Sequence, residues 1–150
     1  MPTNKQLLGT YGEKLVSSLI PCPKCKKSKT LKCLPPNFKC ADIICDFCGY
    51  LAQVKSKNVK SILSVPDIIL SAAWKPHSDR MNAGIFFPLF IVLVNELNKK
   101  DFSIHYLSAD LQPVDIFVVR NALSINARRA GWQGYYINLK NIKNRLVRII

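Results

Sequence analysis

The architecture of the chain is set by residues 39–57, KCADIICDFCGYLAQVKSK. Residues 38–44 and 50–55 are rich in apolar and β-branched side chains, and we expect both to form strands. Residues 45–49, CDFCG, are few enough to form a turn between them. The economical prediction is therefore an antiparallel hairpin with a cysteine-containing turn.

This hairpin would bring Asp42 beside Gln53 and Lys55. The latter two are two positions apart, so they share one face of a strand. An acidic residue, a second oxygen ligand and a lysine in this pattern are what a metal-dependent phosphodiesterase needs: the oxygens hold Mg²⁺ against the scissile phosphate, and the ammonium orients the attacking water. Such a triplet can also occur by chance on a solvated strand face of a basic protein. The pattern is therefore evidence for a nuclease site only together with the predicted hairpin.

Two CxxC pairs frame the hairpin, the second of them in its turn. Pairs separated by about 15 to 20 residues can supply four thiolates to a tetrahedral zinc ion, and a glycine after the second pair helps the backbone turn around the sulfur atoms. Unligated buried thiols or a redox CxxC are the alternatives. A site closed by four thiolates is structural. The predicted zinc ligands are Cys22, Cys25, Cys45 and Cys48.

The remaining cysteines, Cys33 and Cys40, are surplus to this set. We expect ordinary buried thiols, with an alternative ligand or a weaker second site as the other interpretation. The amino terminus has no apolar core of the secretory type, which favours a cytoplasmic protein with reduced cysteines.

Composition favours one globular domain and a polyanionic partner. The chain has 150 residues, of which 49% are hydrophobic and 21% charged, so it is neither disordered nor fibrous. Its formal net charge is +13, which points to nucleic acid or an anionic membrane surface. The longest apolar run, residues 83–94, contains Pro88 and is too short for a spanning helix of about 20 residues.

Hydrophobic periodicity predicts a mixed α/β fold, in which one sheet is flanked by helices. A helix is expected from Asn4 to Leu19, ended by Pro21. The other expected elements are a helix over 66–74, strands over 85–94 and 103–109, a short helix within 114–124, and two short closing strands in 135–139 and 145–150. The two histidines, His77 and His105, lack partners at ligand spacing and are interpreted as structural.

Two basic segments could contact DNA. Residues 127–134, ARRAGWQG, carry Arg128 and Arg129, which can donate to phosphates or guanine, and Trp132, whose flat surface could pack on a methyl group. A core Trp with two solvated arginines is the alternative. The second segment is a lysine run in 24–32, which suits either a solvated loop or phosphate contact.

Taken together, these motifs resemble those of the DpnI-type restriction endonucleases, the Dam-replacing family. The resemblance follows the chain in order: a helical Glu13, then CPKC, the segment 40–57, and ARRAGWQGYYINL near the end. It implies a PD-(D/E)XK nuclease fold with an inserted zinc site, spanning residues 1–150 as a single domain. Members such as DpnI continue into a winged-helix domain, and we expect none in this chain.

The family pattern carries over residue by residue. Asp42 matches the metal-binding Asp and Lys55 the catalytic Lys, whereas Gln53 stands where the pattern has Glu. An amide oxygen can ligate Mg²⁺ but adds no charge, so weaker metal binding is expected. Glu13 occupies the place of an acidic helix residue near the metal, or is a solvated Glu. Lys57 completes the expected DNA contacts.

The resemblance implies a type II methyl-directed restriction endonuclease. It would cleave duplex DNA with Mg²⁺, at GATC sites whose adenine is methylated, while Zn²⁺ stiffens the hairpin. A nuclease of the same fold with another target is one alternative. A zinc-stabilised DNA-binding protein that has lost catalysis is the other, and Gln53 is its best support.

Overall fold

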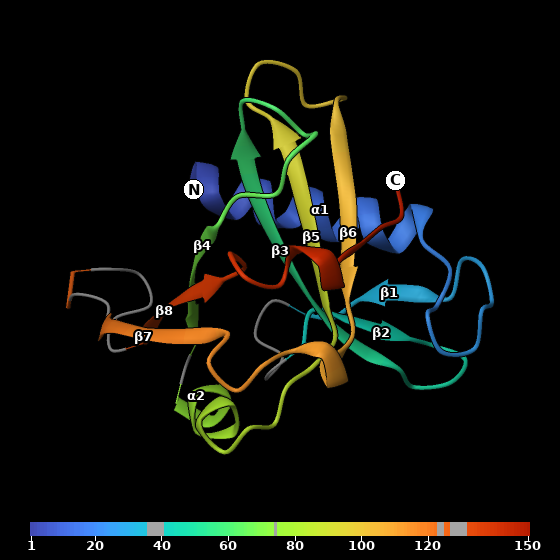
Figure 1. Cartoon of the computed structure of the whole chain (residues 1–150). Coiled ribbons are helices and arrows are strands. Elements are labelled where there is room, and N and C mark those ends of the chain that lie inside the picture. Colours follow the sequence, from blue (N-terminus) through green and yellow to red (C-terminus); the bar gives the residue numbers. More distant parts are fainter. Residues whose placement is uncertain (36–40, 74, 123–124, 127–131) are drawn as a thin grey trace.

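The computed structural model describes residues 1–35, 41–73, 75–122, 125–126 and 132–150. These form one larger and one smaller β-sheet with two α-helices, a mixed α/β fold (Figure 1). The helices are α1 (Asn4–Leu19) and α2 (Lys75–Asn82), and two short 3-10 turns span Ala109–Leu111 and Lys143–Arg145. Neither described α-helix has the length and apolar content that a bilayer crossing requires.

The larger sheet has the strand order β1-β2-β3-β5-β6-β9. Only β3 and β5 run parallel, and the other neighbours are antiparallel. β5 is buried at six of its seven positions, which explains its unbroken apolar sequence LFIVLV. The strands are β1 (Leu31–Cys33), β2 (Ile43–Cys45), β3 (Leu51–Val59), β5 (Leu89–Asn95), β6 (Phe102–Leu107) and β9 (Val147–Arg148).

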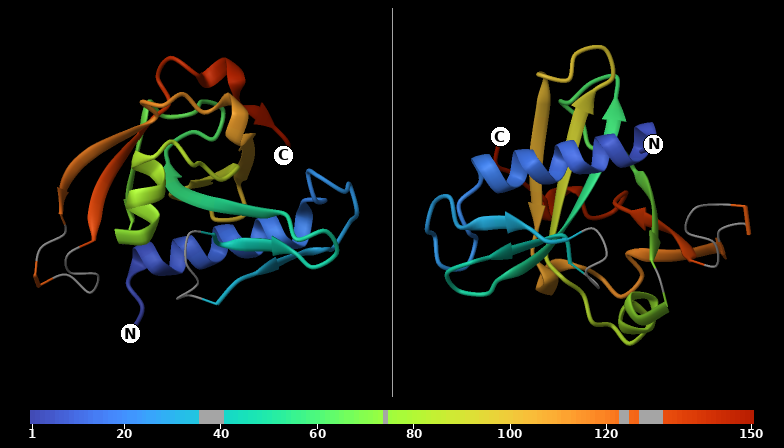
Figure 2. Two further views of the ribbon diagram at one scale, coloured as in Figure 1. Left: turned by 90° about the horizontal axis from the view of Figure 1, so that it is seen from below. Right: turned by 180° about the vertical axis from the view of Figure 1, so that it is seen from behind.

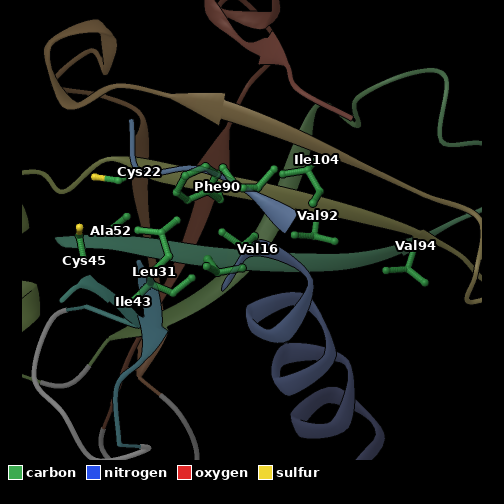
Figure 3. Close-up of a cluster of buried hydrophobic side chains, with 12 residues drawn as sticks. Val16, Cys22, Leu31, Ile43, Cys45, Ala52, Phe90, Val92, Val94 and Ile104 are labelled. Carbon is green, nitrogen blue, oxygen red and sulfur yellow. The ribbon is translucent and has the colours of Figure 1, made fainter. Parts of the chain in front are cut away.

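Helix α1 covers one face of this sheet. Thr3 begins it with a capping box, in which Thr3 and Gln6 exchange hydrogen bonds between side chain and backbone. Val16 then packs in one core cluster with Ala52 and with Phe90, Val92 and Val94 of β5 (Figure 3). The residues of β3 that face α1 are therefore Ala52 and its alternate neighbours, and the intervening residues face the other way.

The small sheet and α2 lie on the opposite side of the large sheet (Figure 2). Its strands are antiparallel in the order β4-β8-β7, namely β4 (Ile68–Ala73), β8 (Gln133–Asn138) and β7 (Phe117–Ala122). A second core cluster fills the space between the sheets with Leu89, Ile91 and Leu93 of β5 and Ile137 of β8. Because Gln53 and Lys55 pair with Leu89 and Ile91, they point to this side.

Several elements differ from the sequence-based expectations. Residues 66–74 were expected to be helical, but 68–73 form β4, because all six positions pair with β8. The short helix expected within 114–124 is instead β7, which pairs with the other edge of β8. The β-branched and aromatic residues that begin both strands suit this pairing. The helix on this side is α2, and β1 was not predicted.

Candidate functional site

The four predicted zinc ligands converge in the folded chain. The Sγ atoms of Cys22, Cys25, Cys45 and Cys48 all lie within 4.8 Å of one another. Cys22 and Cys48 are 3.6 Å apart, and Cys25 and Cys45 are 3.7 Å apart. Zinc–sulfur bonds of about 2.3 Å in a regular tetrahedron give sulfur–sulfur distances of about 3.8 Å. The cluster therefore has the dimensions of a tetrahedral thiolate site and could hold a zinc ion.

Local backbone geometry brings the two CxxC pairs together. Lys26 donates its backbone N–H to the Cys22 carbonyl at 2.9 Å, and Lys26 has φ 64°. Cys45 donates its backbone N–H to Tyr50 O at 2.8 Å across the hairpin, and Gly49 takes φ 77°, where glycine is favoured. The expected hairpin with its cysteine turn is thus present between β2 and β3. Cys22 and Cys45 lie at one end of the α1-side core (Figure 3).

Two thiols of this cluster, those of Cys22 and Cys45, have pKa values far from the ordinary value. Burial raises the pKa of Cys22 to about 12. Burial acts in the same direction on Cys45, but hydrogen bonds with the Thr30 hydroxyl and with the backbone N–H groups of Cys48 and Phe47 together outweigh it and lower the pKa of Cys45 to about 6. A sulfur that accepts several hydrogen bonds is already suited to carry negative charge, as a metal-bound thiolate does.

Two cysteines lie outside this cluster. Cys33 is exposed, which corrects the expectation of a buried thiol, and its Sγ lies 3.6 Å from Ser17 Oγ. Cys40 lies outside the described residues.

Asp42 immediately precedes β2 and is hydrogen-bonded to the neighbouring strand β3. Its Oδ2 accepts a hydrogen bond from the backbone N–H of Val54 at 2.8 Å, and its own N–H donates to Ala52 O at 3.0 Å. Val54 is the residue between Gln53 and Lys55, whose side chains share the other face of the strand. The carboxylate is therefore anchored to the backbone of β3 between these two positions. Oδ1 has no hydrogen-bond partner among the residues that the structure describes.

Gln53 is buried beneath α2, with 5% of its surface exposed. Its backbone N–H donates to Pro88 O at 2.8 Å, which fixes β3 to the start of β5. Its side-chain Nε2 lies 2.9 Å from Nε2 and 3.3 Å from Nδ1 of His77. A residue of α2 therefore belongs to the same site as the hairpin, which the sequence analysis did not anticipate for His77.

Lys55 and His77 are coupled electrostatically. Burial, together with the smaller effect of the positive charges of Lys55 and Arg80, lowers the pKa of His77 to about 4. The imidazole is consequently neutral near pH 7. Lys55 lies two positions after Gln53 on β3, on the same face of the strand.

The other predicted site residues have different surroundings. Glu13 is half-buried on α1, which packs on the face of the sheet opposite to Gln53 and Lys55. Lys57 is half-buried, and its Nζ donates to Ile68 O at 2.9 Å, linking β3 to β4. Glu13 thus lies on the α1 side of the sheet, Lys57 lies on the strand that carries Gln53 and Lys55, and the functional roles of both stay predictions.

The predicted DNA contacts are described only in part. Arg128 and Arg129 lie outside the described residues. Trp132 is half-buried directly before β8. Its neighbour Gln133 is the first residue of β8.

The lysine run beside the cysteine cluster is exposed. Within the described ranges, none of its lysines forms an ion pair with an acidic side chain. Lys27 Nζ lies 4.0 Å from the ring centroid of Phe47, which is 63% exposed. The exposed lysines are Lys24, Lys26, Lys27, Lys29 and Lys32. This edge of the molecule is therefore a concentrated positive surface.

Comparison with known proteins agrees with these features. A family model described as "DpnI: Dam-replacing family" matches residues 3–150. A search of curated proteins found no match. Because the family model covers nearly the whole chain, the chain belongs to the Dam-replacing family of DpnI.

Proposed function

We propose that this protein is a Mg²⁺-dependent endonuclease of the PD-(D/E)XK type that cleaves duplex DNA at adenine-methylated GATC sites. Membership of the DpnI family implies methyl-directed restriction endonuclease activity in general. The target sequence, the metal and the residues involved are our proposal.

The observation that carries the proposal is the anchoring of Asp42. Its Oδ2 is held by Val54 N–H, and its Oδ1 has no partner among the described residues. Gln53 and Lys55 flank Val54 on β3. A carboxylate oxygen and an amide oxygen are ligands that suit a hard divalent cation. The donors therefore fit Mg²⁺, with one negative charge from the protein.

Each residue has a distinct proposed role. Asp42 and Gln53 would hold Mg²⁺, which when bound lowers the pKa of water and neutralises charge on the scissile phosphate. Lys55 would donate hydrogen bonds to the attacking water or to a phosphate oxygen and orient it. Glu13 would assist as an acidic group from α1. Hydrolysis then adds water across one P–O bond of the backbone and leaves a phosphate and a hydroxyl.

The cysteine cluster supports this site mechanically. Asp42 and Cys45 are three residues apart, about 10 Å along a strand. Zinc bound to Cys22, Cys25, Cys45 and Cys48 would fix the turn end of the hairpin, and metal ligands must be held to a fraction of an ångström.

Recognition of DNA is assigned to the basic segments. Arg128 and Arg129 would contact phosphates or guanine, Lys57 would add a phosphate contact, and Trp132 would contact the adenine methyl group. The formal net charge of +13 favours a polyanionic partner for the whole chain.

The test is digestion of plasmid DNA purified from adenine-methylating and non-methylating hosts, in Mg²⁺. We expect cleavage of the methylated plasmid only, and none by the Asp42→Ala protein. Equal digestion of both plasmids contradicts methyl specificity, and digestion by Asp42→Ala contradicts the assigned site.

A second candidate is a zinc-stabilised DNA-binding protein without catalysis. It is favoured by Gln53, whose neutral and buried amide bonds to His77 and adds no charge for a cation. Such a protein would bind DNA in EDTA. It would not cleave DNA in the presence of any divalent ion. Calorimetry with Mg²⁺ distinguishes the two, because the nuclease binds Mg²⁺ and the Asp42→Ala variant does not.

A further inference from the structure

The turn of the β2–β3 hairpin carries an exposed aromatic ring. Phe47 lies between Cys45 and Cys48 and is 63% exposed. Of the aromatic side chains that the structure describes, it is the only exposed one, and the others are buried or half-buried. The ring therefore contributes little to the core, and its place in the turn calls for a different explanation.

This turn is joined to the loop that follows α1 (Figure 1). The backbone N–H of Asp46 donates to Thr30 O at 2.8 Å, and within the loop the N–H of Cys22 donates to Lys27 O at 3.0 Å. Lys27 Nζ lies 4.0 Å from the centroid of the Phe47 ring. The ammonium group and the ring are thus presented side by side from backbone that is already fixed, which lowers the entropy cost of binding a ligand.

The loop carries more positive charge than its surroundings balance. Residues 14–41 contain seven lysines and no acidic residue. Asp46 is the one acidic residue of the turn, and within the described ranges it forms no ion pair with these lysines. Lys26 and Lys29 have φ 64° and 61°, a left-handed backbone that glycine or asparagine adopts at lower cost. The clustered lysines therefore reduce stability through backbone strain and mutual repulsion, and an anionic ligand would relieve the repulsion.

The chemistry of this surface selects a class of ligand. Ammonium groups bind anions, whereas a flat apolar ring packs against another flat apolar group. Nucleic acid presents both side by side, with phosphates along its backbone and sugars and bases next to them. An acidic protein segment would match the lysines but offers the ring no regular partner. Membership of the DpnI family favours DNA as the nucleic acid.

We propose that Phe47 and the lysines around it form a DNA-contact surface outside the cleavage site, in which the lysines bind backbone phosphates and the ring packs on the sugar or base of an adjacent nucleotide. This inference rests on the proposed function in one respect, because it takes DNA as the partner. It gives the cysteine-containing turn direct contact with DNA in addition to its supporting role. The lysines are Lys24, Lys26, Lys27, Lys29 and Lys32.

The surface is separate from the proposed metal ligands and from the small sheet. Phe47 follows Cys45 by two residues, and Cys45 is about 10 Å along the strand from Asp42. Successive phosphates of one DNA strand are about 3.4 Å apart along the helix axis, so this distance corresponds to about three nucleotides. β7 and β8 lie on the other side of the molecule (Figure 2). The surface would therefore hold DNA that flanks the target, whatever its sequence.

The test measures DNA binding by fluorescence anisotropy in EDTA, with a labelled duplex that carries one adenine-methylated GATC site. Phe47→Ala should weaken binding about fivefold or more, because loss of aromatic–base packing typically has at least this effect. The slope of log affinity against log salt should stay unchanged in this variant, because no charge is removed. Phe47→Trp, which keeps a flat ring, should retain the wild-type affinity.

The matched control is Leu97→Ala. Leu97 is 91% exposed in the turn between β5 and β6, and it also has exposed lysines nearby, Lys99 and Lys100. Its loss should leave the affinity for DNA unchanged. Because Phe47 and Leu97 are both exposed, their variants should keep the wild-type melting temperature. Should Phe47→Ala fail to fold, Phe47→Leu takes its place, since it keeps apolar bulk without a flat ring and should also weaken binding.

Lys27→Gln tests the phosphate contact by itself. It should reduce the salt slope by about 0.9, the contribution of one phosphate. The double variant of Lys27 and Phe47 should lose less affinity than the two single losses multiplied, because either change alone already disengages part of the shared contact.

Three results would overturn the inference. Wild-type affinity in Phe47→Ala removes the ring from the interface, and an unchanged salt slope in Lys27→Gln removes the ammonium group. If Phe47→Ala instead reduces binding to vesicles of phosphatidylcholine and phosphatidylserine and leaves the affinity for DNA unchanged, the surface is a membrane contact. Failure of the proposed function is distinguishable, because it is a lack of cleavage in Mg²⁺ by a wild-type protein whose binding in EDTA still depends on Phe47.

Discussion

Gly12 of α1 lies directly against Ser56 of β3, so closely that a Cβ at position 12 would come within 1.8 Å of Ser56 Oγ. The Ser56 hydroxyl is buried and has no hydrogen-bond partner among the residues that the structure describes. The helix therefore crosses the central strand at a point where only glycine fits, one residue before Glu13.

Gly12→Ala should consequently destabilise the protein. Overpacking of this kind costs about 1–3 kcal/mol of unfolding free energy, measured by urea denaturation. Gly9→Ala is the matched control, since nothing lies within 4 Å of a Cβ there, and it should stabilise the helix by up to about 1 kcal/mol. Adding Ser56→Ala should partly rescue Gly12→Ala, because the nearest remaining contact is the Ser56 Cβ at 3.1 Å. Equal effects of the two glycine substitutions would contradict the close crossing.

Two substitutions of Asp42 should separate its structural and chemical roles. Asp42→Asn keeps an oxygen for Val54 N–H but loses the charge, so DNA cleavage should fall on the order of 100-fold or more while the melting temperature changes little. Asp42→Ala also leaves that N–H without its acceptor, at a cost of about 1–3 kcal/mol. Cleavage rates and thermal melting check this, and full activity of Asp42→Asn would exclude Asp42 as a metal ligand.

Removal of the zinc proposed at the four-cysteine cluster should unfold the hairpin. We expect about one zinc per chain by elemental analysis. Cys45→Ser, or prolonged chelation, should lower the melting temperature by roughly 10 °C, as loss of several kcal/mol does in a domain of this size. Cys33→Ser provides the control, because Cys33 is exposed and outside the cluster. Loss of zinc from Cys33→Ser would revise the ligand set.

Stability should fall on acidification because of His77. Its pKa is about 4 in the folded protein, below its ordinary value of 6.5. Between these values the unfolded chain binds a proton that the folded chain does not, so unfolding becomes easier as pH drops from 6.5 towards 4. By pH 5 the loss should be about 1–2 kcal/mol. Urea denaturation at pH 7 and 5 measures it. The pKa of His105 is also lowered by burial, so the difference between wild type and His77→Asn isolates the contribution of His77.

The lysines beside the cysteine cluster should make the affinity for DNA depend on the salt concentration. Each phosphate contact adds about 0.9 to the slope of log affinity against log salt. Replacing Lys24, Lys27 and Lys29 together by Gln should reduce that slope by up to about 3, as measured by fluorescence anisotropy in EDTA. The control replaces Lys99 and Lys100, which are exposed at the far end of β5. An unchanged slope in the triple variant would indicate a solvated loop.

The sequence was informative where residues act locally. The CxxC spacing predicted the cysteine cluster, and the alternation around Asp42 and Gln53 predicted the hairpin, because both depend on short-range geometry. The small sheet was not predictable in this way. Short apolar stretches such as β4 and β7 do not by themselves reveal whether they form helix or strand, and here the answer depends on β8, which is distant in sequence from β4 and pairs with both.

The same limit explains why His77 was missed. Nothing within a few residues of His77 suggests a site, and its partner Gln53 is 24 positions away. Its position depends on α2, which was not predicted as a helix. The one sequence feature that pointed to such a neighbour was Gln53 itself, because a buried amide in place of a carboxylate needs a hydrogen-bonding partner.

Strand β2 is three residues long and begins immediately after Asp42, while its last residue is Cys45. For a nuclease of the kind proposed, loss of zinc from Cys45 and its partner cysteines, or oxidation of their thiols, would inactivate the enzyme. A cell short of zinc, or one whose thiols were oxidised, would carry an enzyme unable to cut DNA. Protection against incoming DNA would then depend on the zinc supply of the host as well as on the methylation pattern of its DNA.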